Sequence, residues 1–221
     1  PVSRKPHAKQ WLDLAVYRPI PDLPGSHPVV SLVRMSNKYQ ALALFSGGLD
    51  SVLAAKTIQR QGIEVLGLHF TSPFFGKTHK IPQWQQDYGL DIVAVDIGED
   101  YVHMMMNKPR FGFGKVLNPC VNCKILMLQK AKELLAQYGA SFLISGEVLG
   151  QRPMSQRRDA MNSIIRDGGV KEILLRPLCA KHLPATKPEE DGLIDREKLH
   201  DCKGRGRKGQ LALAKEFGIT K

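Results

Sequence analysis

The sequence predicts an α/β fold, a doubly wound parallel sheet of about five strands. Two observations support it: apolar runs of strand length alternate with segments of helical periodicity, and a glycine-rich turn follows the first clear strand and opens a helix. The 221 residues, 43% hydrophobic and 24% charged, suit one globular domain with a small appendage. Since there is neither an apolar run of about 18 residues nor a signal-peptide pattern, we expect a cytoplasmic protein with no membrane span.

The first half of the predicted sheet alternates strand and helix. The apolar run YQALALF (39–45) is the first strand, and a helical pattern over 50–61 ends at a glycine. EVLGLHF (64–70) is the second strand, 81–89 is a short helix, and DIVAVDI (91–97) is the third strand.

The second half continues the alternation. The longest helix, 120–139, has apolar residues at spacings of three and four and a glycine at its end. A fourth strand (140–146), a weaker helix (155–166), a fifth strand (171–178) and a last helix (208–217) follow. Strands separated by helices predict parallel pairing.

Three regions differ in composition. Residues 1–38 contain frequent prolines and no sustained apolar period, which predicts an arm outside the core. Residues 39–180 form the predicted sheet domain, and 181–221 form a basic, helical C-terminal extension.

The turn SGGLDS (46–51) is the main functional signal. Its glycines permit close backbone approach, and the helix that it opens attracts anions to its free N–H groups. Neither of the two commoner phosphate-binding glycine motifs is present. Asp50 is unusual there because phosphate repels a bare carboxylate, so it indicates a bridging metal. The alternative is that Asp50 only offsets the helix dipole.

This turn, placed between a strand and a helix, resembles the pyrophosphate loop of the ATP pyrophosphatases, which cleave ATP between the α and β phosphates. The resemblance implies the Rossmann-like adenine nucleotide alpha hydrolase (HUP) fold, with Asp50 acting through Mg²⁺. It also implies nucleoside contacts from the end of the second strand, although a lone His69 is more often structural. The ATP-binding residues expected from the resemblance up to this point are Ser46, Gly47, Gly48, Leu49, Asp50, Ser51, His69, Phe70 and Thr71.

The second signal is the cysteine pair in NPCVNCK (118–124). Asn118 suits a helix N-cap and Pro119 the first helical position, which puts Cys120 in the first turn. A thiolate is stabilised there and becomes a nucleophile, and Cys123 shares its helix face. We rank reactive thiols first, an iron–sulfur cluster with a third ligand second, and zinc last.

With SGGLDS upstream, NPCVNCK also resembles the NPC-x-x-C segment of the tRNA 2-thiouridine synthases. ISGEVLGQRPMSQ (144–156) resembles the GE-x-LGQ segment of the tRNA 4-thiouridine synthases. In these enzymes ATP adenylates a uracil carbonyl oxygen, and sulfur carried on cysteine displaces AMP. By position, Cys120 and Cys123 would carry a persulfide or bind a 4Fe-4S cluster, and Gly146, Glu147 and Gln151 would line the ATP site.

Basic residues are clustered in two segments of a chain whose net charge is +11, which favours an RNA partner. The alternative is a solvated charged face. The expected partners are tRNA and a sulfur-donor protein such as a cysteine desulfurase, and we also consider a homodimer. The expected RNA-binding residues are Arg152, Arg157, Arg158, Lys203, Arg205, Arg207 and Lys208.

The two other cysteines fit no motif of the thiolating enzymes. Cys179 and Cys202 are the downstream candidates for a resolving thiol, but isolated cysteines are more often small buried residues. Two alternatives to RNA thiolation therefore stay open. One is an ATP pyrophosphatase that activates a small carboxylate to form an amide or nitrile, and the other is a nucleotide- or RNA-binding module without turnover.

Overall fold

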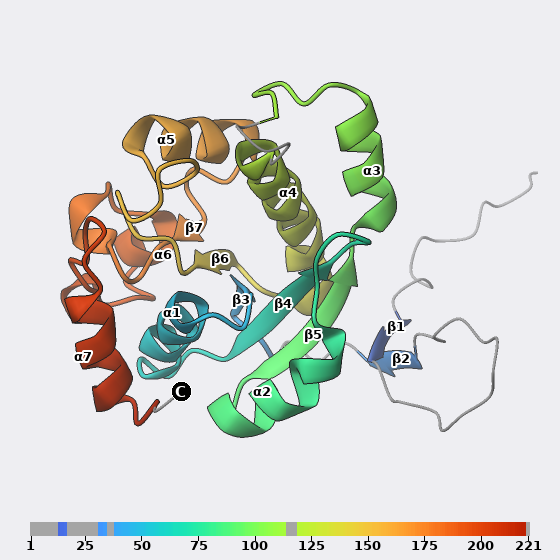
Figure 1. Ribbon diagram of the computed structural model, residues 1–221. Coiled ribbons are helices and arrows are strands. Elements are labelled where there is room, and N and C mark those ends of the chain that lie inside the picture. Colours follow the sequence, from blue (N-terminus) through green and yellow to red (C-terminus); the bar gives the residue numbers. More distant parts are fainter. Residues whose placement is uncertain (1–12, 17–30, 35–37, 114–118, 220–221) are drawn as a thin grey trace, which may run out of the picture.

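The sheet consists of five parallel strands in the order β5-β4-β3-β6-β7, which confirms the predicted fold class (Figure 1). The computed structural model describes residues 13–16, 31–34, 38–113 and 119–219. The chain starts the sheet at its centre, adds two strands on one side, and then returns to add two on the other. This reversal creates the switch point at which such sheets bind ligands. The strands are β3 (Ala41–Leu44), β4 (Val65–Thr71), β5 (Asp91–Asp96), β6 (Phe142–Ser145) and β7 (Leu174–Leu175).

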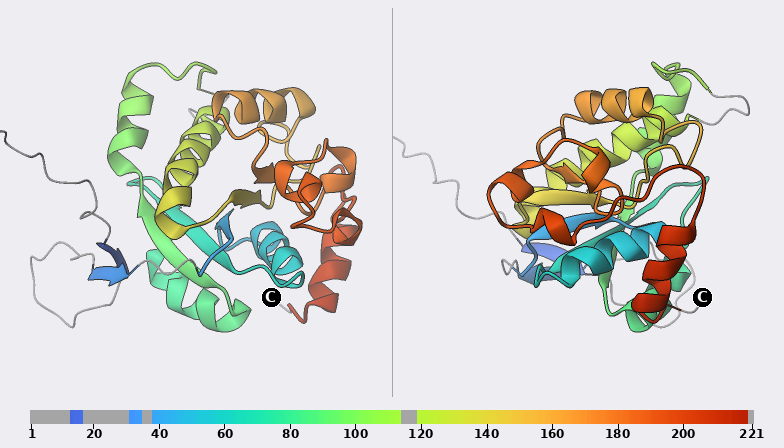
Figure 2. Two further views of the ribbon diagram at one scale, coloured as in Figure 1. Left: turned by 180° about the vertical axis from the view of Figure 1, so that it is seen from behind. Right: turned by 90° about the vertical axis from the view of Figure 1, so that its left-hand side faces the viewer.

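Helices cover both faces of the sheet, as the two views in Figure 2 show. Alternate residues of β3 point to opposite faces: Ala41 and Ala43 belong to one apolar cluster, and Leu42 and Leu44 belong to the other. The first cluster includes α1 and α7, and the second includes α4 and part of α5. The helices are α1 (Leu49–Gln59), α2 (Ile81–Tyr88), α3 (Gly98–Met106), α4 (Cys120–Tyr138), α5 (Arg158–Asp167), α6 (Lys187–Glu190) and α7 (Lys208–Glu216), with short 3-10 turns at Thr78–Lys80, Ala180–His182 and Arg196–Lys198.

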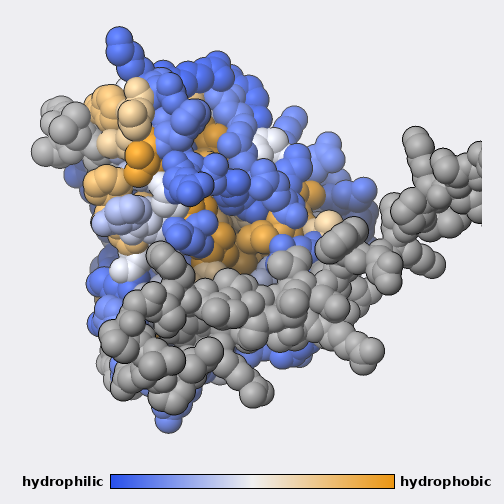
Figure 3. Space-filling view, turned by 90° about the vertical axis from the view of Figure 1, so that its right-hand side faces the viewer, coloured by the Kyte–Doolittle hydropathy of each residue, from blue (hydrophilic) through white to orange (hydrophobic). Residues whose placement is uncertain are grey.

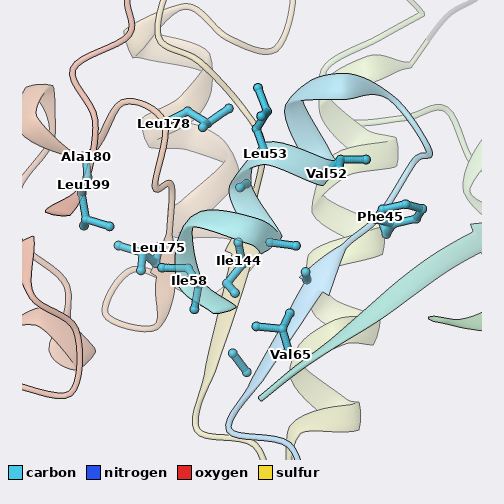
Figure 4. Close-up of a cluster of buried hydrophobic side chains, with 14 of the residues drawn as sticks. Phe45, Val52, Leu53, Ile58, Val65, Ile144, Leu175, Leu178, Ala180 and Leu199 are labelled. Atoms are coloured by element: carbon cyan, nitrogen blue, oxygen red, sulfur yellow. The ribbon is translucent and has the colours of Figure 1, made fainter. Parts of the chain in front are cut away.

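The core under α1 joins the centre of the sheet to the C-terminal part of the chain (Figure 4). Ile58 of α1 lies beside Ile144 of β6 and Leu175 of β7, and all three are at most 1% exposed. Leu199 belongs to the same cluster although it comes from the predicted extension.

Residues of the predicted C-terminal extension are also bonded to the sheet domain through the backbone. The N–H of His200 donates to the carbonyl of Pro177 at 2.9 Å, and that of Cys202 donates to the carbonyl of Leu178 at 2.8 Å. This part of the chain is therefore packed onto the sheet domain.

The structure differs from the predicted elements in three places. The fifth strand shrinks to Leu174–Leu175, because 170–173 form a turn and Pro177, which lacks an N–H, follows soon after. Helix α3 escaped prediction because Tyr101 is its one buried residue, which leaves no apolar stripe. In the predicted arm, β1 (Asp13–Val16) pairs antiparallel with β2 (Ser31–Arg34). Within the described residues no helix is long and apolar enough to cross a membrane.

We expect Leu53→Ala to destabilise the fold by about 2–5 kcal/mol, since Leu53 is 0% exposed in the core under α1 and truncation leaves a cavity. Chemical denaturation monitored by circular dichroism measures the free energy of unfolding. The matched control is Leu211→Ala at a residue that is 59% exposed, for which the change should stay within about 0.5 kcal/mol. Equal losses in both variants would contradict this assignment of the core.

Candidate functional site

The predicted phosphate loop connects β3 to α1. The Ser51 hydroxyl donates to the carbonyl of Gly48 at 2.7 Å, and the N–H of Gly48 donates to Ser46 Oγ at 3.3 Å. Gly48 is the N-cap of α1, and no side chain caps this helix N-terminus. Binding of an anion there stays a prediction.

Position 47 has to be glycine because Trp84, a residue that the sequence did not single out, packs against it. The φ of Gly47 is +75°, and a Cβ at this position would lie 2.2 Å from Cζ2 of Trp84 in α2. Trp84 is 8% exposed and packs edge-on against Phe45 and His69, with ring centroids 5.6 and 5.1 Å apart. The indole of Trp84 therefore packs against the loop at Gly47. A single tryptophan in a short polar helix was the signal available in the sequence.

Gly146 lies against the other side of the loop. β3 and β6 are paired so that Leu44 is opposite Ser145, and the chain leaves both strands at the same edge. A Cβ on Gly146 would lie 2.4 Å from the carbonyl oxygen of Asp50. Gly146 is therefore packed directly against the backbone of Asp50, and its role in ATP binding stays a prediction.

The Asp50 carboxylate has partners from two distant segments. Gln151 Nε2 donates to one oxygen at 2.8 Å, and Arg207 Nη2 donates to the other at 3.2 Å. Gln210 Nε2 in turn donates to Gln151 Oε1 at 2.7 Å. Gln151 is therefore bonded to the phosphate loop, and its role in ATP binding stays a prediction. Arg207, predicted to bind RNA, lies against the phosphate loop.

The predicted nucleoside contacts have different environments. His69 is buried: Nε2 accepts from the N–H of Lys77 at 2.9 Å, and Nδ1 is 3.0 Å from the carbonyl of Phe45. Burial lowers the pKa of His69. With both ring nitrogens engaged, it matches the structural alternative. Phe70 is buried in the core, whereas Thr71 is partly exposed.

Thr71 also lines a cavity of about 780 Å³ at the carboxyl ends of β4 and β5. Its other lining residues include Asp96, Glu99 and Val102. Figure 3, which shows the right-hand side of the view in Figure 1, has hydrophobic residues exposed among hydrophilic ones. The cavity is wide open to solvent, and its lining combines apolar side chains with the carboxylates of Asp96 and Glu99.

The cysteine pair begins α4, as predicted. Pro119 is the N-cap and Cys120 is the first helical residue, so the expected boundary shifts by one; Asn118 lies outside the described residues. Cys120 and Cys123 are both partly buried, and burial raises the pKa of Cys123 to about 11. Burial and these two thiols also raise the pKa of Tyr101, which places the α3 phenol near the pair.

Glu147 connects the cysteine helix to the sheet. It is 4% exposed, and Oε2 accepts from Arg176 Nε at 3.0 Å, while Lys124 Nζ is 3.8 Å from Oε1. Burial opposes its ionisation, but Lys124 and Arg176 hold the pKa of Glu147 below its usual value. Arg176 was missed, although a charged residue inside the apolar run KEILLRPL signals a buried partner.

The donor sets allow a test of the predicted metals. Within the described residues no group of three or more His, Cys, Asp or Glu could hold a metal ion. The single carboxylate of Asp50 fits Mg²⁺ when phosphates and water supply the remaining ligands. Cys120 and Cys123 alone do not fit a 4Fe-4S cluster, which needs three or four protein ligands.

The remaining predicted RNA-binding residues are exposed. Arg157 bonds to Asp159 through two nitrogens, each at 3.2 Å, and Arg158 donates to the carbonyl of His182 at 3.3 Å. Their RNA role stays a prediction. Arg152, Lys203, Arg205 and Lys208 are likewise on the surface.

Known proteins resemble this chain over the segment that carries the site. A family model described as thiamine biosynthesis protein (ThiI) matches residues 36–182. A probable tRNA sulfurtransferase of Methanobrevibacter smithii is 29% identical over 194 residues, covering 84% of this chain and 48% of that protein. The tRNA-specific 2-thiouridylase MnmA of Petrotoga mobilis is 32% identical over 135 residues, covering 52% of this chain and 36% of that protein.

The chain thus spans about half or less of the length of these relatives. Among solved structures, a predicted subunit of tRNA methyltransferase from Methanocaldococcus jannaschii is 15% identical, covers 80% of this chain and 76% of its own, and has a TM-score of 0.48. NMN synthetase from Francisella tularensis is 13% identical, covers 81% and 85%, and has a TM-score of 0.42.

We expect Gly146→Ala to weaken ATP binding at least about tenfold, because the added methyl would displace the backbone at Asp50. Isothermal titration calorimetry measures the dissociation constant. The control is Gly206→Ala, where an added Cβ meets nothing within 4 Å. Unchanged affinity in a folded Gly146→Ala protein would contradict the assignment.

We expect the thiols that remain in Cys120→Ser to react slowly with iodoacetamide at pH 7.5. Burial raises the pKa of Cys123 and of Cys179 to about 11, and it also raises that of Cys202. At this pH fewer than about one thiol in a thousand with such a pKa is ionised, so the rate should climb as the pH approaches 11. Peptide mass spectrometry locates the adducts; rapid labelling of Cys123 at pH 7.5 would contradict the environment described.

Proposed function

The chain belongs to the thiamine biosynthesis protein (ThiI) family, and from that premise we propose that it catalyses ATP-dependent thiolation of RNA, with a tRNA uridine as the substrate. The observation that carries the proposal is the coupling of two sites. Gly146 touches the phosphate loop at Asp50, and the next residue, Glu147, forms an ion pair with Lys124 beside the cysteine pair. The names of the relatives support tRNA as the substrate.

In the first step the phosphate loop binds and orients ATP. The open N–H groups at the start of α1 and the Ser46 and Ser51 hydroxyls suit the phosphates. Mg²⁺, held by Asp50 and the phosphates, would neutralise charge on the pyrophosphate. The uracil carbonyl oxygen attacks the α phosphorus, the bond to the β-phosphate oxygen breaks, and pyrophosphate leaves.

In the second step sulfur replaces the activated oxygen. A persulfide on Cys120, formed by a sulfur-donor protein, attacks the uracil carbon, and AMP departs with the original carbonyl oxygen. The thiol of Cys123 then attacks Cys120, which breaks the sulfur–sulfur bond to the base and leaves a C=S group. The resulting Cys120–Cys123 disulfide requires an external dithiol to reduce it. We propose the persulfide route because the described residues do not fit a cluster.

Helix α4 favours Cys120 as the sulfur carrier. Cys120 is the first residue of the helix, where backbone N–H groups that lack intrahelical partners can donate to the sulfur of a persulfide. Cys123 has its pKa raised to about 11 by burial and is mainly a neutral thiol at pH 7. Its role in resolution therefore depends on proton removal when the substrate is bound.

Three exposed arginines near the start of α5 suit RNA phosphates. Arg152 follows directly on Gln151, which bonds to Asp50, and Arg157 and Arg158 are the N-cap and the first residue of α5. A phosphate backbone lying across them would bring a base toward the phosphate loop.

We expect Cys120→Ser to release pyrophosphate from ATP in a tRNA-dependent manner while transferring no sulfur, because only the second step needs the thiol. Pyrophosphate release is measured by a coupled assay, and thionucleosides are measured by mass spectrometry of digested RNA. Cys179→Ala, which removes a buried thiol placed in no step, should keep both activities.

Full thiolation by the Cys120→Ser variant would contradict the sulfur assignment. Absence of pyrophosphate release by the wild type under every condition would favour a binding module. RNA-independent release with a small carboxylate would favour an amide-forming or nitrile-forming ligase.

A further inference from the structure

Arg207 is the basic residue whose position the sequence analysis did not foresee. It is the N-cap residue of α7, and Nη2 donates to Asp50 Oδ1 at 3.2 Å. The Asp50 side chain is 17% exposed and that of Arg207 is 48% exposed. The guanidinium therefore reaches the phosphate loop while keeping one side open to solvent.

Buried contacts on both sides hold this segment in place. Gln210, which follows Arg207 by three residues and is 1% exposed, bonds to Gln151, the other partner of Asp50. Before Arg207, the N–H of Gly204 donates to the carbonyl of Leu149 at 2.8 Å. The backbone of Arg207 is thus anchored over the loop, unlike a mobile surface arginine whose ion pair contributes little.

The chemistry of the loop explains what a guanidinium does there. Asp50 adds negative charge to a turn proposed to bind a polyphosphate, and the two would repel each other without a cation. Arginine presents five N–H donors in a planar fork that matches phosphate oxygens, and one nitrogen suffices for the contact with Asp50.

We propose that Arg207 is a phosphate-binding residue of the ATP site, which pairs with Asp50 when no nucleotide is bound and contacts the β and γ phosphates of ATP when it is. This inference rests on the proposed function. Arg207 lies in the basic segment 202–210, which by its composition resembles an RNA-binding surface. The inference assigns this residue to nucleotide binding instead. It also makes the C-terminal segment part of the ATP site.

The test compares three ligands that differ in their phosphates. The dissociation constants of ATP, pyrophosphate and AMP are measured in Mg²⁺ buffer by calorimetry for the wild type and for Arg207→Ala. We expect ATP and pyrophosphate to bind at least about tenfold more weakly to the variant, the loss typical of a charge-assisted hydrogen bond, and AMP to stay within about twofold. Arg207→Lys should fall between, since lysine keeps the charge without the fork.

Lys215→Ala is the matched control, because it removes one positive charge from the exposed last turn of the same helix. All three affinities should match the wild type. Arg207→Gln repeats the measurement if the alanine variant is unstable, and thermal unfolding without nucleotide reports the integrity of each protein.

Four outcomes would overturn the inference. ATP affinity within about twofold of the wild type in both Arg207→Ala and Arg207→Gln would exclude a phosphate contact. An equal loss for AMP and ATP would indicate a structural role only, and a loss confined to tRNA affinity would assign Arg207 to RNA. A wild-type protein that binds neither ATP nor pyrophosphate would overturn the proposed function as well, so the two failures are distinguishable.

Discussion

The parallel pairing of β3 with β6 is the constraint on which the candidate site depends. Because Leu44 lies opposite Ser145, the phosphate loop and the segment beginning at Gly146 leave the sheet together. The two segments are so close that position 146 has no space for a Cβ. Both the shape of the loop and the position of Glu147 follow from this contact.

The second organising feature is the charge around Asp50. Its carboxylate lies in the first turn of α1, where the helix terminus favours anions, and its two oxygens bond to Gln151 and Arg207. These partners lie 101 and 157 residues away in sequence. The C-terminal segment is therefore joined to the phosphate loop, both by this ion pair and by the core cluster that contains Leu199.

The cysteine helix is joined to the same centre through buried charge. Glu147 and Arg176 are each 4% exposed, and an unpaired charge at such depth would cost several kcal/mol. Lys124 adds a third charge from α4. Lys124 is in the same helix as the cysteine pair, and its Nζ lies 3.8 Å from Glu147 Oε1. Glu147 follows Gly146, which packs against Asp50 of the phosphate loop. This ion pair therefore connects α4, and with it the cysteine pair, to the phosphate loop.

Much of the fold follows from local sequence. The apolar runs predicted β3 to β6, and SGGLDS and NPCVNCK predicted the loop and the helix that begins at Cys120, because strand length, helical period and turn residues act over a few positions. The exceptions have local causes too. Pro177 shortens β7, and the exposed surface of α3 conceals its helical period.

By itself, the sequence determined the alternation of β3, α1, β4, α2 and β5, the pattern of the loop after β3, and the position of the cysteines at the start of α4. The tertiary structure decided which residues surround them. Trp84 beneath Gly47, Arg176 on Glu147 and Arg207 on Asp50 are contacts between segments far apart in the chain. No local pattern encodes such contacts, because they depend on how the whole sheet and its helices pack. Arg207 is an example: the basic sequence around it predicts RNA binding, but the packing of α7 brings its guanidinium to Asp50 of the phosphate loop.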